Sequence, residues 1–173
     1  SIINDISALR FDPDLGAVAA ESGTPVVLMH MLGSPKTMQL SPSYTDLIGE
    51  ISDFFSAAIV RAQKQSISKS NIIIDPGIGF GKTVSHNLLL IRQIQAFAAL
   101  DAPILVGPSR KSFIRNLLKD EHSNDIPPDK PIVETGTQAA VAAAVLCGAH
   151  IVRVHDVANT RATVRILDAM RSA

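Results

Sequence analysis

The sequence is poor in the features that cross-link a chain or carry it through a membrane. It contains one cysteine, Cys147, no tryptophan, and no run of 18 consecutive apolar residues. A single cysteine cannot build a disulfide framework within the chain, which suits a reducing compartment, and we expect a cytoplasmic protein. The most apolar stretch, 139–152, is alanine-rich and too short to cross a bilayer, so we expect no membrane partner.

Excess charge of either sign is also missing. The 16 basic residues balance the 16 acidic ones, and no long basic run occurs. Proteins whose main partner is nucleic acid carry clustered positive charge, so we expect no nucleic-acid partner. Apolar residues make up 46% of the 173 residues and charged residues 18%. This composition is sufficient to bury a core, and residues 1–173 are predicted to form one domain.

Short β-branched runs alternate with helical patterns along the chain. Strands are predicted at residues 1–6, 24–31, 71–75, 102–107 and 150–156. Helices are predicted at residues 13–22, 43–65, 85–100, 109–118, 135–147 and 158–171. The polar, proline-bearing stretch 119–134 is predicted to be a flexible loop.

This alternation predicts an α/β fold with a parallel sheet, because the strands are apolar on both faces. Either a (β/α) barrel or an open doubly wound sheet fits the pattern. At the usual length of a barrel unit, the chain corresponds to about five or six units rather than eight.

Polar residues gather where the predicted strands end, which is where parallel α/β folds bind their ligands. These residues are Asn4 and Asp5; Met29, His30 and Met31; Asp75; Ser109, Arg110 and Lys111; and Arg153, His155 and Asp156. One such residue would be read as a helix cap or a solvated charge. Their presence at all five strand ends predicts a site.

The last strand offers an anion site. Side chains alternate along a strand, so Arg153 and His155 share one face. The planar guanidinium of Arg153 can donate two parallel hydrogen bonds, and the imidazole of His155 adds a titratable donor. Together they suit a phosphate group. The alternative is an arginine paired with a neighbouring acid and a His155 that caps the next helix.

Asn4 and Asp75 suit a flat heterocycle, because an amide both donates and accepts whereas a carboxylate accepts two hydrogen bonds. Lys111 and Arg153 can flank such a ring, one by hydrogen bonding and one by stacking. Met29 adds a polarizable apolar contact. A heterocycle read together with an anion indicates a substrate that carries a phosphate or diphosphate.

The stretch "DPGIGFGKT", residues 75–83, is similar to a phosphate-binding loop in its glycines and its Lys-Thr ending. The Walker pattern fails because Pro76 stands where its first glycine belongs. The dinucleotide fingerprint fails because Lys82 stands where its third glycine belongs. What remains is a carboxylate followed by a glycine-rich turn, which is either an ordinary strand exit or a loop that approaches a ligand closely.

Taken in order, the motifs resemble those of the dihydropteroate synthases of folate biosynthesis. They are "IINDI", "PVVLMHM" with "PKTMQ", "IIIDPGIGFGKT" with "HNL", "PILVG" with "SRKSFI", "GT" with "AA", and "GAHIVRVHDV". The resemblance implies a (β/α)8 barrel. It also implies the condensation of 6-hydroxymethyl-7,8-dihydropterin diphosphate with p-aminobenzoate to 7,8-dihydropteroate and diphosphate. Sulfonamides compete for the p-aminobenzoate site in this family.

The resemblance also implies a role for each matching residue. Asn4 and Asp75 bind the pterin, Met29 lines its slot, Lys111 contacts the ring and Arg153 stacks on it. Arg153 and His155 hold the departing phosphates. Gly79, Phe80, Lys82 and Ser109 form the p-aminobenzoate side, with Ser109 at its carboxylate. Of these residues, Asp75, Lys111 and Arg153 are the implied catalytic ones.

The sequence departs from the family pattern at its start, which matches the fourth strand of the barrel. We therefore expect about strands 4–8 of an N-terminally incomplete barrel, which would be nearly inactive alone. Mg²⁺ is expected through the diphosphate and an absent loop, and the full-length enzyme is expected to be a homodimer. Alternatives are a pterin-binding methyltetrahydrofolate–corrinoid methyltransferase domain and a non-catalytic pterin-binding half-barrel.

Overall fold

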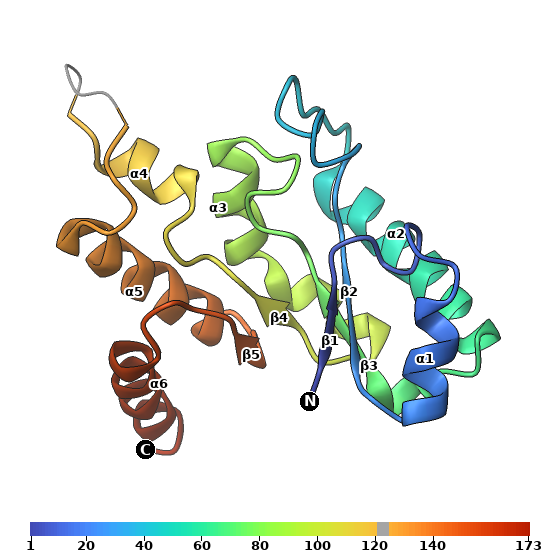
Figure 1. Cartoon of the computed structure of the whole chain (residues 1–173). Helices are drawn as coiled ribbons and strands as arrows, with labels where there is room; N and C mark the ends of the chain where they lie inside the picture. Colours follow the sequence, from blue (N-terminus) through green and yellow to red (C-terminus); the bar gives the residue numbers. More distant parts are fainter. Residues whose placement is uncertain (121–124) are drawn as a thin grey trace.

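A computed structural model describes residues 1–120 and 125–173 (Figure 1). Each predicted strand forms, and each is shorter than predicted. They are β1 (Ile3–Asp5), β2 (Val26–Met29), β3 (Ile72–Asp75), β4 (Leu105–Val106) and β5 (Ile151–Val152). The ends of the predicted strands 102–107 and 150–156 are extended chain or turns rather than paired strand.

Helices follow the strands in turn. They are α1 (Leu15–Ser22), α2 (Leu47–Lys64), α3 (Val84–Arg92), α4 (Ser112–Leu118), α5 (Pro131–Leu146) and α6 (Val157–Arg171), with 3-10 segments η1 (Lys69–Asn71) and η2 (Ile94–Leu100). The single helix predicted at 85–100 is therefore two segments, α3 and η2. No helix among the described residues is long and apolar enough to span a membrane.

The predicted loop 119–134 is wrong at its end, because α5 begins at Pro131. Proline suits the first position of a helix, where its missing N–H would have no partner and its φ is already helical. The loop prediction also covers residues 121–124, which lie outside the described residues, and its flexibility stays a prediction.

The strands lie side by side in chain order and are parallel. Strand β2 pairs with β1 and β3, and β4 pairs with β5. A parallel bridge between Ile74 and Ile104 joins the two groups. A doubly wound sheet would reverse its strand order at a switch point, whereas a barrel wall adds each strand beside the preceding one. No such reversal occurs among the strands of residues 1–120 and 125–173.

The two faces of this sheet differ. One face packs under the helices and belongs to the main core; it comprises Val26, Leu28, Ile72, Ile74, Ile104 and Val106. The other face carries a small separate cluster of Val27, Ile73 and Leu105, with Ile151 packed against it. Alternation along each strand produces this division. In Figure 1 the helices follow one another from α2 at the right, through α3, to α5 and α6 at the left.

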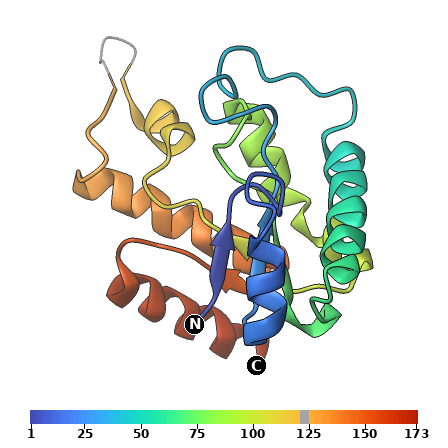
Figure 2. The ribbon, with the colours of Figure 1, turned by 45° about the vertical axis from the view of Figure 1, so that its right-hand side comes forward.

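The carboxyl ends of the strands meet at one rim. In Figure 2 the arrow of β1 points toward the top, where the long loop between β2 and α2 also lies. Because the strands are parallel, the residues that follow each of them are brought to this end of the sheet.

Candidate functional site

Three predicted site residues share the face of the sheet that lies opposite the helices. Asn4 is level with Val27, and Met29 is level with Asp75. Residues two apart on a strand point the same way, so Asn4, Met29 and Asp75 lie on one face. Asp5 points to the other side, and its carboxylate accepts hydrogen bonds from the N–H and hydroxyl of Ser7, at 2.9 and 2.7 Å.

Arg153 lies on the same face but follows β5, the strand at the opposite edge from β1. It follows Ile151, which is level with Leu105, by two residues. Its side chain borders a groove of about 570 Å³ that Leu105 and Ile151 also line. Among residues 1–120 and 125–173 its guanidinium forms no ion pair. The alternative interpretation, an arginine held by a neighbouring acid, is therefore not the one observed.

Asp75 is a buried carboxylate at the centre of this rim. It is 7% exposed, and its Oδ1 accepts a hydrogen bond from the N–H of Gly77 at 2.7 Å. Burial raises the pKa of Asp75, whereas that N–H and the positive charges of Lys111, Lys82 and Arg153 oppose the rise. One carboxylate therefore lies within the field of three cations.

Lys82 is buried inside the loop rather than presented on its surface. Its Nζ lies 3.0 Å from His30 Nδ1 and donates to the carbonyl oxygen of Phe80 at 2.9 Å. Burial lowers the pKa of Lys82 to about 7, while Asp75 acts in the opposite direction. Burial, followed by the charge of Lys82, lowers the pKa of His30 to about 3. His30 is therefore neutral, and its Nδ1 can accept a hydrogen bond from the Lys82 amine.

Lys111 lies at the edge of the same loop. Its Nζ donates to the carbonyl oxygen of Ile78 and stands 4.2 Å from the centre of the Phe80 ring. An ammonium over an aromatic face is stabilised by the ring quadrupole. Burial lowers the pKa of Lys111 to about 8, against the attraction of Asp75. Lys111 thus lies against Phe80 and within the electrostatic influence of Asp75.

The glycine loop is not a phosphate loop, because the amides of its first two glycines and of Phe80 are already hydrogen-bonded within the protein. The N–H of Gly77 bonds Asp75, that of Gly79 bonds Asn87 Oδ1 at 2.7 Å, and that of Phe80 bonds the Gly77 carbonyl at 3.0 Å. A phosphate cradle needs these donors free and converging on the anion. The sequence-based rejection of both phosphate motifs therefore holds.

Gly77 is required for this turn. Its φ is +69°, and a Cβ there would lie 1.9 Å from the carbonyl oxygen of His30. We expect Gly77→Ala to lower the free energy of unfolding by about 2 kcal/mol or more, since backbone must move. Gly23→Ala is the matched control, because its φ is +60° but no atom lies within 4 Å of the added carbon.

Gly23→Ala should therefore lower the free energy of unfolding by only about 1 kcal/mol, the cost of placing alanine in a left-handed conformation. Urea unfolding of the two variants measures the difference. Equal losses would show that the close approach to His30 does not constrain the loop.

Several supports of the loop escaped the sequence analysis. Asn87 is 2% exposed and holds Gly79, while Gln39 Nε2 donates to the Gly79 carbonyl at 2.6 Å. The hydroxyl of Tyr44 donates to the Gly81 carbonyl at 2.8 Å. Asn87 lies in the "HNL" motif of the family resemblance, which assigned it no role. Gln39 lies in the "PKTMQ" motif, likewise without an assigned role, and nothing indicated Tyr44. They are 40 and 37 residues away from their partners.

A left-handed residue turns the chain at Ser109–Lys111. Arg110 has a φ of +59° although it is not glycine. Its N–H donates to Thr137 Oγ1 at 3.1 Å, and its Nε lies 3.5 Å from Glu134 Oε2. Both partners belong to α5, so this helix holds the turn that carries Ser109 and Lys111.

Thr137→Val tests this support. The hydroxyl is fully buried, accepts from Arg110 and donates to the Val133 carbonyl at 3.0 Å. Valine has nearly the same shape but leaves the Arg110 N–H unpaired, so we expect a loss of about 2 kcal/mol in unfolding free energy. Thr135→Val, at an exposed position on the same helix, should change it by less than about 0.5 kcal/mol. Thermal or urea unfolding checks both, and similar losses would contradict the role of Thr137.

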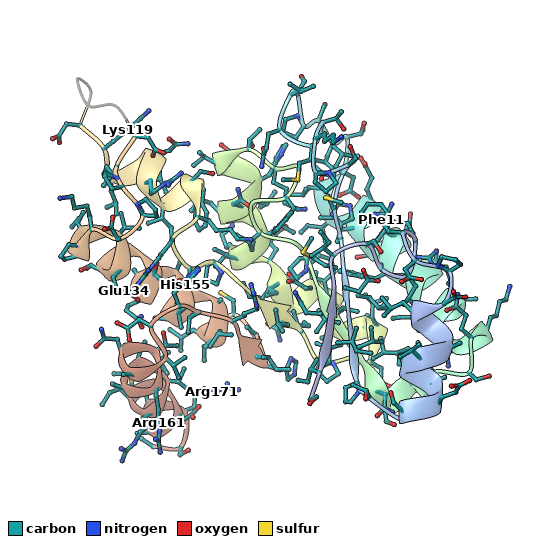
Figure 3. The ribbon with its side chains drawn as sticks, in the orientation of Figure 1. Phe11, Lys119, Glu134, His155, Arg161 and Arg171 are labelled. Atoms are coloured by element: carbon teal, nitrogen blue, oxygen red, sulfur yellow. The ribbon has the colours of Figure 1, made fainter. Side chains whose placement is uncertain are left out.

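His155 is linked to Ser109 rather than to the next helix. Ser109 Oγ lies 2.8 Å from His155 Nδ1 and accepts from the His155 backbone N–H at 3.3 Å. The N-terminus of α6 is capped by Asp156, whose Oδ1 accepts from Asn159 N–H at 3.0 Å, so the capping alternative for His155 is wrong. Figure 3 draws His155 on the segment after β5, whereas Arg161 and Arg171 project from α6.

The described residues offer no protein-built metal site. No group of three or more histidine, cysteine, aspartate or glutamate side chains gathers within residues 1–120 and 125–173. The one carboxylate at the centre of the rim, Asp75, already faces three positive charges. These residues do not fit a directly ligated Mg²⁺.

The family model described as "Pterin binding enzyme" matches residues 1–155. The dihydropteroate synthase of Synechocystis sp. is 45% identical over 98% of this chain and 56% of its own length. That of Escherichia coli is 42% identical over 99% of this chain and 58% of its own. The chain thus spans less than two thirds of the length of the curated relatives it matches.

Solved structures of dihydropteroate synthases are also similar to this chain. Dihydropteroate synthase from Yersinia pestis with a sulfonamide drug superposes with a TM-score of 0.91 at 40% identity, over 99% of this chain and 59% of that one. The enzyme from Xanthomonas albilineans with 7,8-dihydropteroate gives 0.86 at 34% identity, over 99% of this chain and 61% of that one. With a buried carboxylate among cations at the carboxyl end of its parallel strands, this chain belongs to the family of pterin-binding enzymes.

Proposed function

We propose that this chain carries the pterin- and diphosphate-binding part of a dihydropteroate synthase. The carrying observation is the position of Asp75, a buried carboxylate within the field of Lys82, Lys111 and Arg153. The complexes of relatives with a sulfonamide drug and with 7,8-dihydropteroate support the same choice of ligands. The substrates are then 6-hydroxymethyl-7,8-dihydropterin diphosphate and p-aminobenzoate.

In this reaction the bond between the pterin methylene carbon and the diphosphate oxygen breaks, and a bond from the aniline nitrogen to that carbon forms. The aniline proton is released, and diphosphate leaves with the electron pair of the C–O bond. As the C–O bond loosens, positive charge develops on the methylene and the conjugated pterin. Asp75 is suited to stabilise that charge, because its carboxylate is held in place by Gly77.

Arg153 and His155 are suited to bind the leaving diphosphate, and Lys111 and Asn4 to orient the pterin, with Met29 against its ring. Arg153 and His155 are both exposed, as donors for an anion from solution must be. Mg²⁺ would come with the diphosphate, whose oxygens are its preferred ligands, since the described residues provide no set of their own. No step assigned to these side chains depends on the ion.

The p-aminobenzoate side is supported most directly by Phe80, which lies beside Lys111 and is half-buried. Gly79 and Lys82 would act there by shaping the loop, because Lys82 is only 3% exposed. Contact between Ser109 and the substrate carboxylate stays a prediction. The hydroxyl of Ser109 already bonds His155, so that contact would compete with an existing hydrogen bond.

We propose that the five strands form part of an eight-stranded barrel. Within the described residues, β1 and β5 each pair on one side only, and the apolar cluster of Val27, Ile73 and Leu105 contains no helix residue. Unpaired edges and such an apolar cluster call for covering strands. The chain alone should then be nearly inactive. A homodimer of the longer enzyme and a cytoplasmic location remain part of this proposal.

Titration calorimetry of the chain tests the proposed function. The chain is titrated with 6-hydroxymethyl-7,8-dihydropterin diphosphate, and then with p-aminobenzoate in the absence and presence of the pterin. We expect the pterin diphosphate to bind, and p-aminobenzoate to bind only when the pterin or diphosphate site is filled.

Two other functions predict different results. A methyltetrahydrofolate–corrinoid methyltransferase domain should bind a pterin but ignore p-aminobenzoate. A non-catalytic half-barrel should bind neither tightly. Either pattern would contradict the synthase assignment.

A further inference from the structure

We propose that Ser109 is a positioning residue for His155. Its hydroxyl holds the imidazole by Nδ1, so that Nε2 always carries a proton and donates to the departing diphosphate. The proposal rests on the proposed function for the identity of the anion. The hydrogen-bond geometry between the two residues stands independently of it.

The bonding of the hydroxyl carries the argument. Ser109 is 5% exposed, so an unpaired proton on its Oγ would be costly. The oxygen accepts from the backbone N–H of His155 at 3.3 Å and lies 2.8 Å from Nδ1. Among the described residues, Nδ1 is the one acceptor found for the hydroxyl proton. The serine therefore donates to Nδ1.

This arrangement determines which ring nitrogen remains as a donor. A neutral imidazole that accepts at Nδ1 must carry its proton at Nε2. A charged imidazolium carries protons at both nitrogens, and Nδ1–H can then donate to the serine oxygen. In either protonation state Nε2–H is free to donate. His155 is exposed, so an anion can reach it.

The hydrogen bond between Ser109 and His155 also joins the loop after β4 to the loop after β5. Ser109 follows β4, and His155 lies two residues after Arg153, which follows β5. A hydrogen bond between side chains 46 residues apart prevents the histidine from turning away from the rim. The cost of ordering the ring is then met before the anion binds, which raises affinity.

A double-mutant cycle on the chain tests this role, with inorganic pyrophosphate as the calorimetric probe. We expect Ser109→Ala to weaken pyrophosphate binding about fivefold, the effect of one lost hydrogen bond. In a His155→Ala background the same substitution should change binding by less than about 1.5-fold, because Ser109 acts through His155. Ser56→Ala, at an exposed position on α2, is the control and should change nothing. Equal effects of Ser109→Ala in both backgrounds would overturn the proposal.

A second pair of variants keeps the proposal testable if Ser109→Ala does not fold. Glutamine at position 155 places an N–H₂ near the position of Nε2, and asparagine places one near Nδ1. We expect His155→Gln to keep pyrophosphate affinity within about threefold and His155→Asn to lose about tenfold. The reverse order would overturn the assignment of Nε2 as donor.

¹⁵N chemical shifts of the His155 ring separate this proposal from the proposed function. A wild-type signal with a protonated Nε2 and a hydrogen-bonded Nδ1, altered in Ser109→Ala, supports the positioning role even if pyrophosphate does not bind. In that case the proposed diphosphate site fails and the pairing stands. A protonated Nδ1 in the neutral wild-type ring overturns the proposal whatever pyrophosphate does.

Discussion

Replacing Asp75 with asparagine is expected to lower the turnover of the active enzyme about 10³-fold while changing p-aminobenzoate affinity by less than about threefold. The amide keeps the shape of the carboxylate and can still accept from Gly77 through its oxygen. It removes the negative charge that balances the nearby cations and that would stabilise the cationic pterin. The loss therefore falls on the transition state rather than on the second substrate.

The Asp75 prediction can also be checked on this chain without turnover. Calorimetric affinity for the dihydropterin should fall about 30-fold, because a buried charge-assisted hydrogen bond is lost. Asp53→Asn, an exposed acid on α2, is the control and should leave both quantities unchanged. Unchanged turnover in Asp75→Asn would refute the assigned role.

The contribution of Lys82 to stability is expected to rise with pH. Burial lowers its pKa in the folded protein to about 7 from 10.5. Between these two values the unfolded chain binds more protons than the folded one, so the free energy of unfolding increases with pH. Below pH 7 both states hold the proton, and above about pH 10.5 both have lost it. Lys111, whose pKa is lowered to about 8, acts with the same sign.

Comparison with Lys82→Met isolates this lysine. The difference in unfolding free energy, wild type minus variant, should grow by on the order of 3 kcal/mol between pH 6 and 10. Urea unfolding at pH 6, 8 and 10 measures it. Lys64→Met removes an exposed lysine of α2 and should give a difference that stays flat over this range. A difference for Lys82→Met that is flat, or that shrinks with pH, would show that this amine is not held neutral by burial.

Deprotonation of Lys82 would affect the charge of the site as well as the stability of the fold. Loss of the Lys82 proton leaves Lys111 and Arg153 as the cations around Asp75. Lys82 also joins the end of β2 to the glycine loop through His30 and Phe80. Lys82, predicted as part of the p-aminobenzoate side, is thus buried inside the glycine loop rather than presented on its surface.

Prediction from sequence succeeded where local periodicity was enough. Asn4, Met29 and Asp75 lie at the ends of strands, and alternation assigns them to one face once the strands are parallel. It was less accurate for Arg153 and His155, which were assigned to one face of a strand predicted to run from 150 to 156. Strand β5 ends at Val152, and His155 is oriented by Ser109 instead.

By itself, the sequence determined the order of strands and helices and the chemistry at each strand end, because both depend on side-chain period and residue type within a few positions. Only the tertiary structure decided that Lys82 is buried against His30, that Thr137 holds Arg110, and that Ser109 bonds His155. These partners are 52, 27 and 46 residues apart. Contacts at such separations arise when packing brings loops and helices together, and no local pattern encodes them.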